Sequence, residues 1–532
     1  MVKETAPAPA RRSIGRAAGI ISLLTLLSRV LGLVREQVFA ALLGAGLYGD
    51  AFRAAFKVPN LLRDLFAEGA LSAAFVPTYA RALKSDGKEA AFRLASRLMT
   101  LLSVVLAALV LLGLAFAPQL VRLLAPGFEQ VPGKAEFTVV LTRVMLPFLP
   151  LVSFAAVAMG ILNAHERFAT PAFAPAAFNL ATIGWAAGLW AFGYGPEKVA
   201  FGWAVGTLIG GAAQFLIQVP GLMREGWRFS FDWAPSDPGL RAIGRLMAPA
   251  TVGLAAVQVN IFVNTIFASG QPGAVSWLEY AFRILYLPIG IFGVAVGTVV
   301  TTRLAHSAAA ADLGEMRRTL QESLRLLFFL TLPSTAGLMV LGRPIVRLLY
   351  ERGRFHAGDT DSTAAALAFF AIGLVAYTSV KVLAPAFYAL GRPRVPLMAS
   401  ACAVATNLVV IATLHRVFGF RAIALGTALG SVVNALVLAS VLETRVGGFL
   451  RGLFTSAVAL MVLATGAMAV PAWLASRALE ARLGTHGLRR QVLTGLVPVA
   501  LGGLVYIGTA LALRIPEAHA LWGPLRRRLR RV

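Results

Sequence analysis

The chain has 532 residues, of which 58% are hydrophobic and 14% charged, and its mean hydropathy is +0.76. A soluble protein would carry about 25% charged residues, so this composition excludes a soluble globular protein and indicates a polytopic membrane protein. The net charge of +25 would suggest nucleic-acid binding in a soluble chain, but most arginines here lie in short segments between apolar runs, which indicates membrane topology instead.

The chain begins with a polar, basic segment, MVKETAPAPARRSIGRAAG, and the apolar run that follows exceeds signal-peptide length and contains Arg29. We therefore expect this run to remain as the first membrane span. Similar runs follow, which predicts an all-α polytopic membrane protein with about fourteen transmembrane helices. The spans are expected near 17–43, 50–81, 98–118, 137–162, 169–192, 199–221, 243–268, 275–304, 320–341, 364–389, 395–415, 421–442, 452–475 and 490–514.

Basic residues are distributed unevenly over the segments between these spans. With a cytoplasmic N-terminus, the inside segments hold about twice as many lysines and arginines as the outside loops. An even number of spans then places the C-terminus inside as well. We interpret the basic tail from Leu525, LRRRLRRV, as an inside anchor, with contact to anionic lipids as the alternative.

Two stretches of sequence recur at an offset of about 225 residues, which indicates an internal repeat. LVRLLAPGF at 120–128 resembles IVRLLYERGRF at 345–355, and AFVPTYARAL from Ala74 resembles GTVVTTRLAH from Gly297. The repeat predicts two parallel six-helix lobes around a central cavity, with two appended helices. The expected divisions are an N-terminal tail at 1–16, lobes at 17–225 and 240–445, appended helices at 450–515 and a basic tail at 516–532.

Ionisable residues inside membrane spans are expensive, so each is a functional hypothesis. They are Arg29, Arg35 and Glu36 in the first span; Asp50, Arg53, Lys57, Arg63, Asp64 and Glu68 in the second; Glu279 and Arg283 in the eighth; and Arg143 and Lys381 elsewhere. The alternatives are local ion pairs, such as Glu279 with Arg283 or Lys57 with Asp64, and snorkelling for Arg143 and Lys381. In the overlong second span, Pro59 would kink the helix and Asn60 would begin a new one.

Pairing does not account for the whole set. The first, second and eighth spans hold six cations, and the anions near them are four: Glu36, Asp64, Glu68 and Glu279. Three or four unpaired arginines in a membrane would cost about 10 kcal/mol. A water-filled cavity lowers that cost, and a doubly anionic ligand lowers it further through bidentate guanidinium–phosphate hydrogen bonds. The sequence therefore predicts a cationic cavity and an anionic, phosphorylated substrate.

Two long motifs carry a resemblance to a known family. SRVLGLVREQVFAALLGAG, continued by DAFRAAFKVPNLLRDLFAEGALSAAFVPTYAR, resembles the N-terminal signature of the bacterial lipid II flippases of the MurJ/MviN type. ASGQPGAVSWLEYAFRILYLPIGIFGVAVGTVV resembles the eighth helix of that family. The family belongs to the multidrug/oligosaccharidyl-lipid/polysaccharide exporter superfamily, and the resemblance extends over nearly the whole chain.

The resemblance implies a transporter of the bacterial cytoplasmic (inner) membrane that serves peptidoglycan biosynthesis, cell wall biogenesis and cell shape. Such a flippase moves undecaprenyl-diphosphate-linked precursor, lipid II, between leaflets, and the appended helices form a groove for its tail. The implied diphosphate-binding residues are Arg29, Arg35, Arg63 and Arg283; the supporting or gating residues are Glu36, Asp50, Arg53, Lys57 and Glu279, with Ala40 and Ser276 near a lateral portal. Membrane lipids and cell-wall synthesis proteins are candidate partners, and nothing in the sequence requires more than a monomer.

This chain departs from the family pattern in three ways. Glu36 stands where an aspartate is usual, and Tyr286 stands where some members are acidic. Where some members bind sodium through carboxylates, this chain offers only amides and a hydroxyl: Gln258, Asn260, Asn264, Thr406 and Asn407. We therefore expect no cofactor and disfavour sodium coupling, with a sodium site built from carbonyl and amide groups as the alternative. Membrane potential is the expected driving force, at about 2.3 kcal/mol per charge per 100 mV.

Two rival functions share some of these features. A flippase for another polyprenyl-diphosphate-linked oligosaccharide would have the same fold and cationic cavity. A membrane glycosyltransferase is the enzyme alternative, and its best support is the GDTDS stretch, in which Asp359 and Asp361 are spaced like a metal-binding pair. Asp359 or Thr360 as a helix cap is the simpler interpretation. The only cysteine, Cys402, excludes a cysteine-based metal site.

Overall fold

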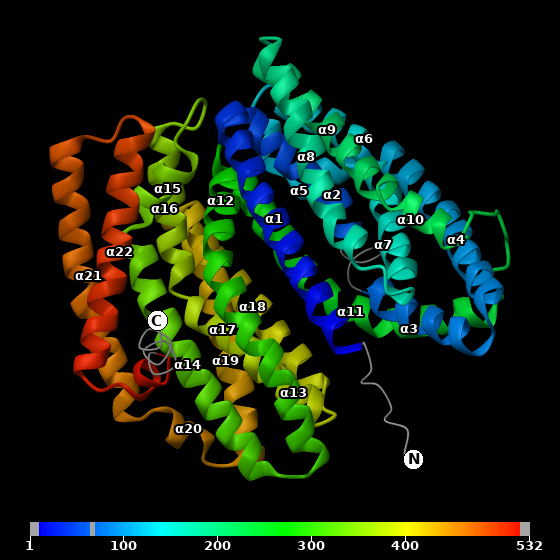
Figure 1. Cartoon of the computed structure of the whole chain (residues 1–532). Helices are drawn as coiled ribbons and strands as arrows, with labels where there is room; N and C mark the ends of the chain where they lie inside the picture. Colours follow the sequence, from blue (N-terminus) through cyan, green and yellow to red (C-terminus); the bar gives the residue numbers. More distant parts are fainter. Residues whose placement is uncertain (1–9, 64–69, 522–532) are drawn as a thin grey trace. The chain divides into compact units, whose positions relative to one another are not determined.

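The computed structural model describes residues 10–63 and 70–521 of the chain. Every regular element in these two ranges is a helix, and no strand occurs in them (Figure 1). The predicted all-helical fold is therefore confirmed. A membrane offers no partner for a free peptide group, so long apolar runs form helices that bond their own backbone.

Ten helical stretches of the described ranges are long and apolar enough to cross a membrane, or eleven if one pair bent by 44° counts as a single span. The ten are α4 (Lys88–Ala115), α6 (Lys134–Met145) with α7 (Phe148–Ala164), α8 (Ala169–Ala191), α9 (Pro196–Leu216) with α10 (Val219–Arg224), α12 to α13 (Ala274–Ala309), α14 (Leu313–Val340), α18 (Arg394–Phe418), α19 (Phe420–Val446), α21 (Ser456–Leu483) and α22 (Leu488–Ala512). The bent pair is α16 (Ala357–Ala371) and α17 (Leu374–Ala389). Each of these coincides with one expected span.

The other three expected spans correspond to helices outside this set. These are α1 (Ala10–Leu43), α2 (Leu47–Arg63) followed by α3 (Ala70–Ser85), and α11 (Pro238–Ser269). The expectation that Asn60 begins a new helix is wrong, because α2 continues through Pro59 to Arg63. A proline removes one backbone donor, and a membrane helix tolerates this when neighbouring groups satisfy the freed carbonyl.

Short helices connect several of the long ones. They are α5 (Ala117–Leu124), the 3-10 turn η2 (Pro126–Gln130), α15 (Gly342–Tyr350) and α20 (Phe449–Leu453). The two repeated stretches, 120–128 and 345–355, fold alike locally. Each forms a short helix that ends in a turn and buries its final phenylalanine, Phe128 or Phe355.

The chain divides into two compact units, Met1–Gln258 and Val259–Val532. In the first unit, α1 packs along α8, α8 along α9, α2 along α6, and α3 against α4 and α7. One extended apolar core of this unit joins Leu71, Phe75 and Tyr79 of α3 to Leu98 of α4 and Ile161 of α7. Burial of these side chains stabilises the unit independently of the charged residues on α1 and α2.

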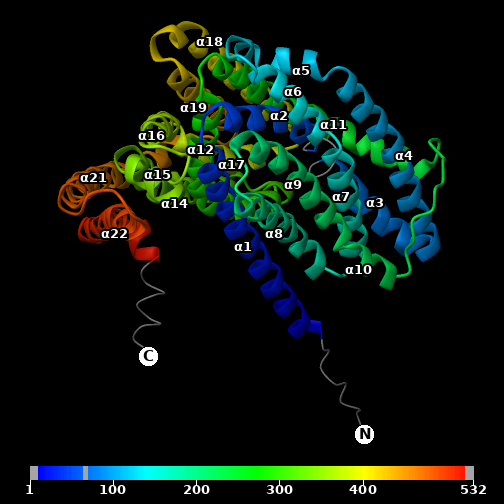
Figure 2. The ribbon, with the colours of Figure 1, turned by 90° about the horizontal axis from the view of Figure 1, so that it is seen from above.

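In the second unit, α18 and α19 pack most closely, and small residues explain why. A Cβ atom at Gly430 of α19 would lie 2.6 Å from the carbonyl oxygen of Ala403 on α18, so only glycine permits this approach. The appended helices α21 and α22 lie side by side in both ribbon views, and α14 packs against α21 (Figures 1 and 2).

One long helix of the second unit changes its winding along its length. α12 (Ala274–Pro288) passes into a π-helical segment, η3 (Ile289–Val294), and then into α13 (Ala295–Ala309). Pro288 lacks the backbone N–H that would bond the carbonyl one turn earlier, and such a break favours a local change of helix type. This segment follows directly after the part of α12 that carries Glu279 and Arg283.

Candidate functional site

One buried carboxylate on α1 holds two arginines of the first unit. Glu36 is 6% exposed; its Oε1 lies 3.2 Å from Nη2 of Arg35, and its Oε2 lies 3.3 Å from Nη2 of Arg53 on α2. The Arg53 guanidinium also lies over the Phe39 ring, 4.7 Å from its centroid, and Arg35 lies 5.2 Å from the centroid of Phe178. The predicted pairing of Arg35 with Glu36 is confirmed, and Arg53 joins the same network.

Arg29 lies nearly two turns earlier on α1 and is exposed. No ion-pair partner lies within 4 Å of it among the residues that the structure describes. The helix is held nearby by Asn179 of α8, whose Nδ2 donates to the carbonyl oxygen of Ser28 at 3.2 Å. A fixed backbone with an exposed guanidinium leaves Arg29 available to an anion from outside the helix.

A second buried ion pair joins α2 to α6. Nζ of Lys134 lies 2.8 Å from Oδ2 of Asp50, and the two side chains are 1% and 0% exposed. The ammonium also lies 4.1 Å from the centre of the Phe128 ring. Asp50 was expected from the sequence, but Lys134 was missed. In the sequence, Lys134 stands directly before an apolar run, and a lysine at that position is typical of the end of a membrane span, so it gave no sign of a buried ion pair.

The remaining charged residues of α2 lie further along the helix. Lys57 and Arg63 are half-buried, and Arg63 is the last residue of α2. The expected partners Asp64 and Glu68 lie outside the described residues, so the pairing of Lys57 or Arg63 with Asp64 stays a prediction.

In the second unit, Glu279 and Arg283 form a pair along α12. Oε1 of Glu279 lies 3.4 Å from Nη2 of Arg283, and their side chains are 32% and 37% exposed. The predicted local pair is therefore present, and it is a long and partly solvated one. Tyr286, one turn beyond Arg283, is 51% exposed. The small residues expected near a portal, Ala40 and Ser276, are both fully buried.

The amides that were considered as a cation site bond to one another. Nδ2 of Asn407 donates to Oδ1 of Asn260 at 2.6 Å and to Oδ1 of Asn264 at 2.8 Å, and Nδ2 of Asn264 donates to Oγ1 of Thr427 at 3.1 Å. The hydroxyl of Thr406 donates to a backbone carbonyl of its own helix instead. Within residues 10–63 and 70–521, no group of three or more His, Cys, Asp or Glu side chains could hold a metal ion.

The acidic pair of the GDTDS stretch has structural partners. Oδ2 of Asp359 accepts a bond from the backbone N–H of His356 at 3.0 Å, which caps α16, and its Oδ1 accepts one from Nε1 of Trp277 at 2.9 Å. Asp361 pairs with Arg343 at 2.6 Å. The helix-cap interpretation of Asp359 is confirmed, and these contacts account for both carboxylates without a metal.

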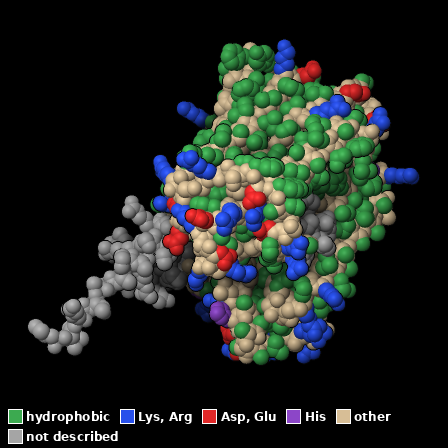
Figure 3. Space-filling view, turned by 90° about the vertical axis from the view of Figure 1, so that its right-hand side faces the viewer, with side chains coloured by type: hydrophobic (Ala, Val, Ile, Leu, Met, Phe, Trp, Pro, Cys, Tyr) green, Lys and Arg blue, Asp and Glu red, His purple; other side chains and the backbone are tan. Residues whose placement is uncertain are grey.

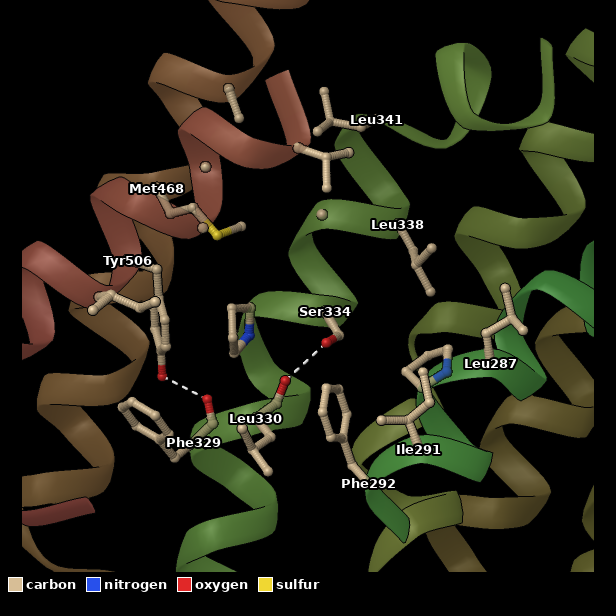
Figure 4. Close-up of a pocket in the computed structure, with 18 of the residues that line it drawn as sticks. Leu287, Ile291, Phe292, Phe329, Leu330, Ser334, Leu338, Leu341, Met468 and Tyr506 are labelled. Carbon is tan, nitrogen blue, oxygen red and sulfur yellow. Dashed lines mark hydrogen bonds between the residues drawn. The ribbon is translucent and has the colours of Figure 1, made fainter. Parts of the chain in front are cut away.

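The appended helices line an apolar cavity of about 600 Å³ (Figure 4). Its walls come from α21 and α22, from α14, and from the end of α12 with η3; they include Leu287, Ile291, Leu338, Met468 and Tyr506. The two hydroxyl groups that line the cavity both donate hydrogen bonds to backbone carbonyl groups. Tyr506 donates to the carbonyl oxygen of Phe329 at 2.7 Å, and Ser334 donates to that of Leu330 at 2.8 Å. The cavity therefore presents hydrocarbon to whatever occupies it.

Comparison with known proteins decides the family. The family model described as "Lipid II flippase MurJ" matches residues 39–492. The chain belongs to the MurJ family of lipid II flippases. The "Probable lipid II flippase MurJ" of Rhizobium meliloti (strain 1021) is 36% identical over 422 residues, which cover 79% of each chain. The "Lipid II flippase MurJ" of Burkholderia cenocepacia is 36% identical over 435 residues, 80% of this chain and 82% of the relative.

Solved structures agree on the fold. The structure titled "Lipid II flippase MurJ, inward closed conformation" superposes with a TM-score of 0.76 at 24% identity, and the match covers 93% of this chain and 98% of that one. The structure titled "Inward-facing conformation of a multidrug resistance MATE family transporter of the MOP superfamily" gives a TM-score of 0.68 at 18% identity, and the match covers 82% of this chain and 99% of that one. The resemblance seen in the two sequence motifs is confirmed, and membership of the MurJ family identifies the chain as a transporter and not an enzyme.

Proposed function

We propose that this chain is a lipid II flippase, which moves the undecaprenyl-diphosphate-linked peptidoglycan precursor from the inner to the outer leaflet of the bacterial cytoplasmic membrane. The observation that carries the proposal is the MurJ family match over residues 39–492. The helical fold, with ten or eleven apolar spans in its described part, supports it, because moving a lipid headgroup across a bilayer requires a protein embedded there.

The diphosphate, in this proposal, is bound by Arg29, Arg35, Arg63 and Arg283. Arg29 is exposed, and Arg283 pairs with the carboxylate of Glu279 at 3.4 Å, which is itself partly exposed. Such a solvated pair contributes about 0–1 kcal/mol, so a doubly anionic diphosphate that bonds the guanidinium in bidentate geometry can replace Glu279.

Arg53 has a different role in this proposal. Its side chain is 4% exposed and is enclosed by Glu36 and the Phe39 ring. We assign it to positioning: it fixes one oxygen of Glu36, so that the other oxygen can orient Arg35. Asp50 and Lys134 then fix the start of α2, one turn before Arg53.

The finer architecture is also part of the proposal: fourteen spans, lobes at 17–225 and 240–445, and appended helices at 450–515 that receive the polyprenyl tail. The hydrocarbon cavity beside α21 and α22 supports the tail groove, and the like folding of the two repeated stretches supports the lobes. We propose alternating access as the mechanism. Membrane potential would drive an anionic headgroup outward by about 2.3 kcal/mol per charge per 100 mV. The mutually bonded asparagines argue against sodium coupling through that cluster.

Complementation tests the proposal. A bacterial strain depleted of its own lipid II flippase would receive the wild type or Arg29→Ala, Arg63→Ala or Arg283→Ala, with membrane levels checked by immunoblot. The matched control is Arg122→Ala, because Arg122 is 71% exposed and its only described ion pair is with the exposed Glu129.

We expect rescue by the wild type and the control, and loss of rescue in each binding-site variant at normal membrane level. Rescue that survives all three substitutions would remove these arginines from the mechanism. Failure of the well-expressed wild type would favour the rival substrate, another polyprenyl-diphosphate-linked oligosaccharide.

A further inference from the structure

The segment that joins α10 to α11 displays large aromatic side chains to its surroundings. Residues 226–237, GWRFSFDWAPSD, form no regular element. Phe229, Phe231 and Trp233 alternate with polar residues and are 51%, 70% and 51% exposed. In Figure 1 the segment is the green loop that stands beside α4 on the right. Three large exposed aromatics in five residues are unusual for a loop in water, because such patches normally mark an interaction surface.

This segment is held firmly against α4. Nε of Arg97 lies 2.8 Å from Oδ2 of Asp232, and Nη1 of Arg97 lies 2.5 Å from Oδ2 of Asp237. The backbone N–H of Asp232 also donates to Oγ1 of Thr100 at 3.1 Å. Asp237 in turn accepts bonds from the backbone N–H groups of the first turn of α11. The aromatic rings are therefore presented by a fixed backbone, and that backbone also sets where α11 begins.

The contact with α4 shows how deep the segment lies in the membrane. Arg97 is the last charged residue before a stretch from Leu98 to Val121 that contains none. A helix with such a stretch enters the hydrocarbon region where the charges end. The segment is attached at Arg97 and Thr100, so its aromatic side chains lie at the boundary between headgroups and hydrocarbon.

The chemistry of the neighbourhood fits that boundary. Tryptophan and other aromatic side chains concentrate at the membrane–water interface. Exposed basic residues lie close by in the chain, at Arg224 and Arg228, and Lys88 begins the helix to which the segment is attached. Basic groups at this level attract anionic headgroups, at about 1 kcal/mol per residue. Figure 3 shows the face of the molecule that includes α4, where hydrophobic side chains predominate and charged ones gather in groups.

We infer that residues 229–233 are an interfacial anchor, in which Phe229, Phe231 and Trp233 insert among the lipid headgroups and Arg97 holds the anchor to α4 through Asp232 and Asp237. The partner is the lipid surface. The anchor fixes the depth in the membrane of the segment that precedes α11. This inference rests on the membrane location of the chain and is independent of which lipid is transported.

Site-directed spin labelling tests the anchor. Single cysteines would be placed at Phe231, Asp86 and Leu111 in a Cys402→Ser background, and the full-length protein would be reconstituted in nanodiscs of phosphatidylethanolamine and phosphatidylglycerol. Asp86 lies in the exposed turn after α3, and a label there is the reference for a water-exposed site. Leu111 is 66% exposed on the uncharged part of α4, and a label there is the reference for a site in the hydrocarbon region. The measurement is the accessibility of each label to oxygen and to a polar nickel complex.

We expect the label at residue 231 to be at least about threefold less accessible to the nickel complex than the label at residue 86, and accessible to oxygen, because polar solutes are excluded from this depth. A label at residue 231 that behaves like the one at residue 86 would overturn the inference. Shelter from both reagents would also overturn it, since the segment would then be covered by protein.

Discussion

At the residue scale, the fully buried pair of Asp50 and Lys134 should be the most sensitive contact of the first unit. We expect Lys134→Met to destabilise the protein by about 3–5 kcal/mol, because it leaves a carboxylate buried without its cation. The double variant Asp50→Leu/Lys134→Met should recover most of that loss, since neither charge of this pair then stays buried. Thermal unfolding in detergent, followed by intrinsic fluorescence, measures both.

The control for this prediction is the exposed pair of Arg343 and Asp361, whose side chains are 49% and 52% exposed. Arg343→Ala should change stability by no more than about 1 kcal/mol. If Lys134→Met were as mild as Arg343→Ala, burial of the Asp50 pair would not matter as we argue.

A second residue-scale prediction concerns pH. A hydrogen bond from Arg167 lowers the pKa of Glu225, and the charges of Arg167, His165 and Lys88 lower it further, against a smaller increase from burial. A carboxyl group with a lowered pKa stabilises the folded state above its ordinary pKa of about 4.3 and loses that contribution as the pH falls through the folded-state pKa.

Glu225→Gln should therefore lower the melting temperature at pH 7, by an amount equivalent to at most about 1 kcal/mol because Arg167 is 68% exposed. The difference from the wild type should shrink as the pH falls below about 4. Melting temperatures of the two proteins over pH 3–8 test this, and a difference that is constant over the whole range would contradict it.

The residue scale also shows what the sequence could not predict. The charged positions on α1, α2 and α12 were identified because charge inside an apolar run is rare. Their roles were not, because whether Arg53 faces water or the Phe39 ring depends on how α1 and α2 pack. Lys134 was missed for the same reason: its carboxylate partner lies 84 positions away in the chain.

At the element scale, α14 contains a proline whose effect is compensated by another helix. Pro333 has no N–H, so the carbonyl of Phe329, four residues earlier, lacks its usual helical donor. Tyr506 of α22 donates to that carbonyl at 2.7 Å, and its side chain is 4% exposed. We expect Tyr506→Phe to cost about 1–3 kcal/mol, the penalty for a buried acceptor left without a donor.

A double-mutant cycle isolates this effect. Pro333→Ala supplies a backbone N–H to Phe329, so Tyr506→Phe should cost less than about 1 kcal/mol in the Pro333→Ala background. Ser334→Ala is the matched control and should also cost little, because the carbonyl of Leu330 still has the N–H of residue 334. Equal costs of Tyr506→Phe in both backgrounds would show that the hydroxyl does not serve the proline.

Elements were predicted from the sequence to the extent that they are long and apolar. Eleven of the expected spans coincide with apolar helices or a bent pair, since hydropathy alone predicts them. The short helices α5, α15 and α20 were not expected as separate elements, because segments of five to nine residues carry no clear period. The change of winding at η3 was signalled only by Pro288 and the glycines after it.

At the scale of the whole molecule, family membership and helical class followed from the sequence, and the orientation in the membrane stays a prediction. It follows from the distribution of lysine and arginine and from an even number of spans. Three predicted spans that are not among the apolar stretches described above decide the matter. They are α1, α2 with α3, and α11. If any of these three failed to cross, every later segment would change sides.

Cysteine accessibility in intact cells tests that topology. In a Cys402→Ser background, single cysteines at Asp86 and Arg392 should react with a membrane-impermeant maleimide only after permeabilisation, whereas cysteines at Glu129 and His486 should react before it. All four positions are exposed and lie in segments between long helices, so a failure to react reports sidedness and not burial. Asp86 lies after α3 and Glu129 after α4, so this pair reports whether the chain crosses between them. Asp86 follows α1 to α3, so its reaction in intact cells would refute the predicted crossing of these charged helices. Arg392 and His486 follow α11, so a reversed pattern at these two positions alone would place the error at α11.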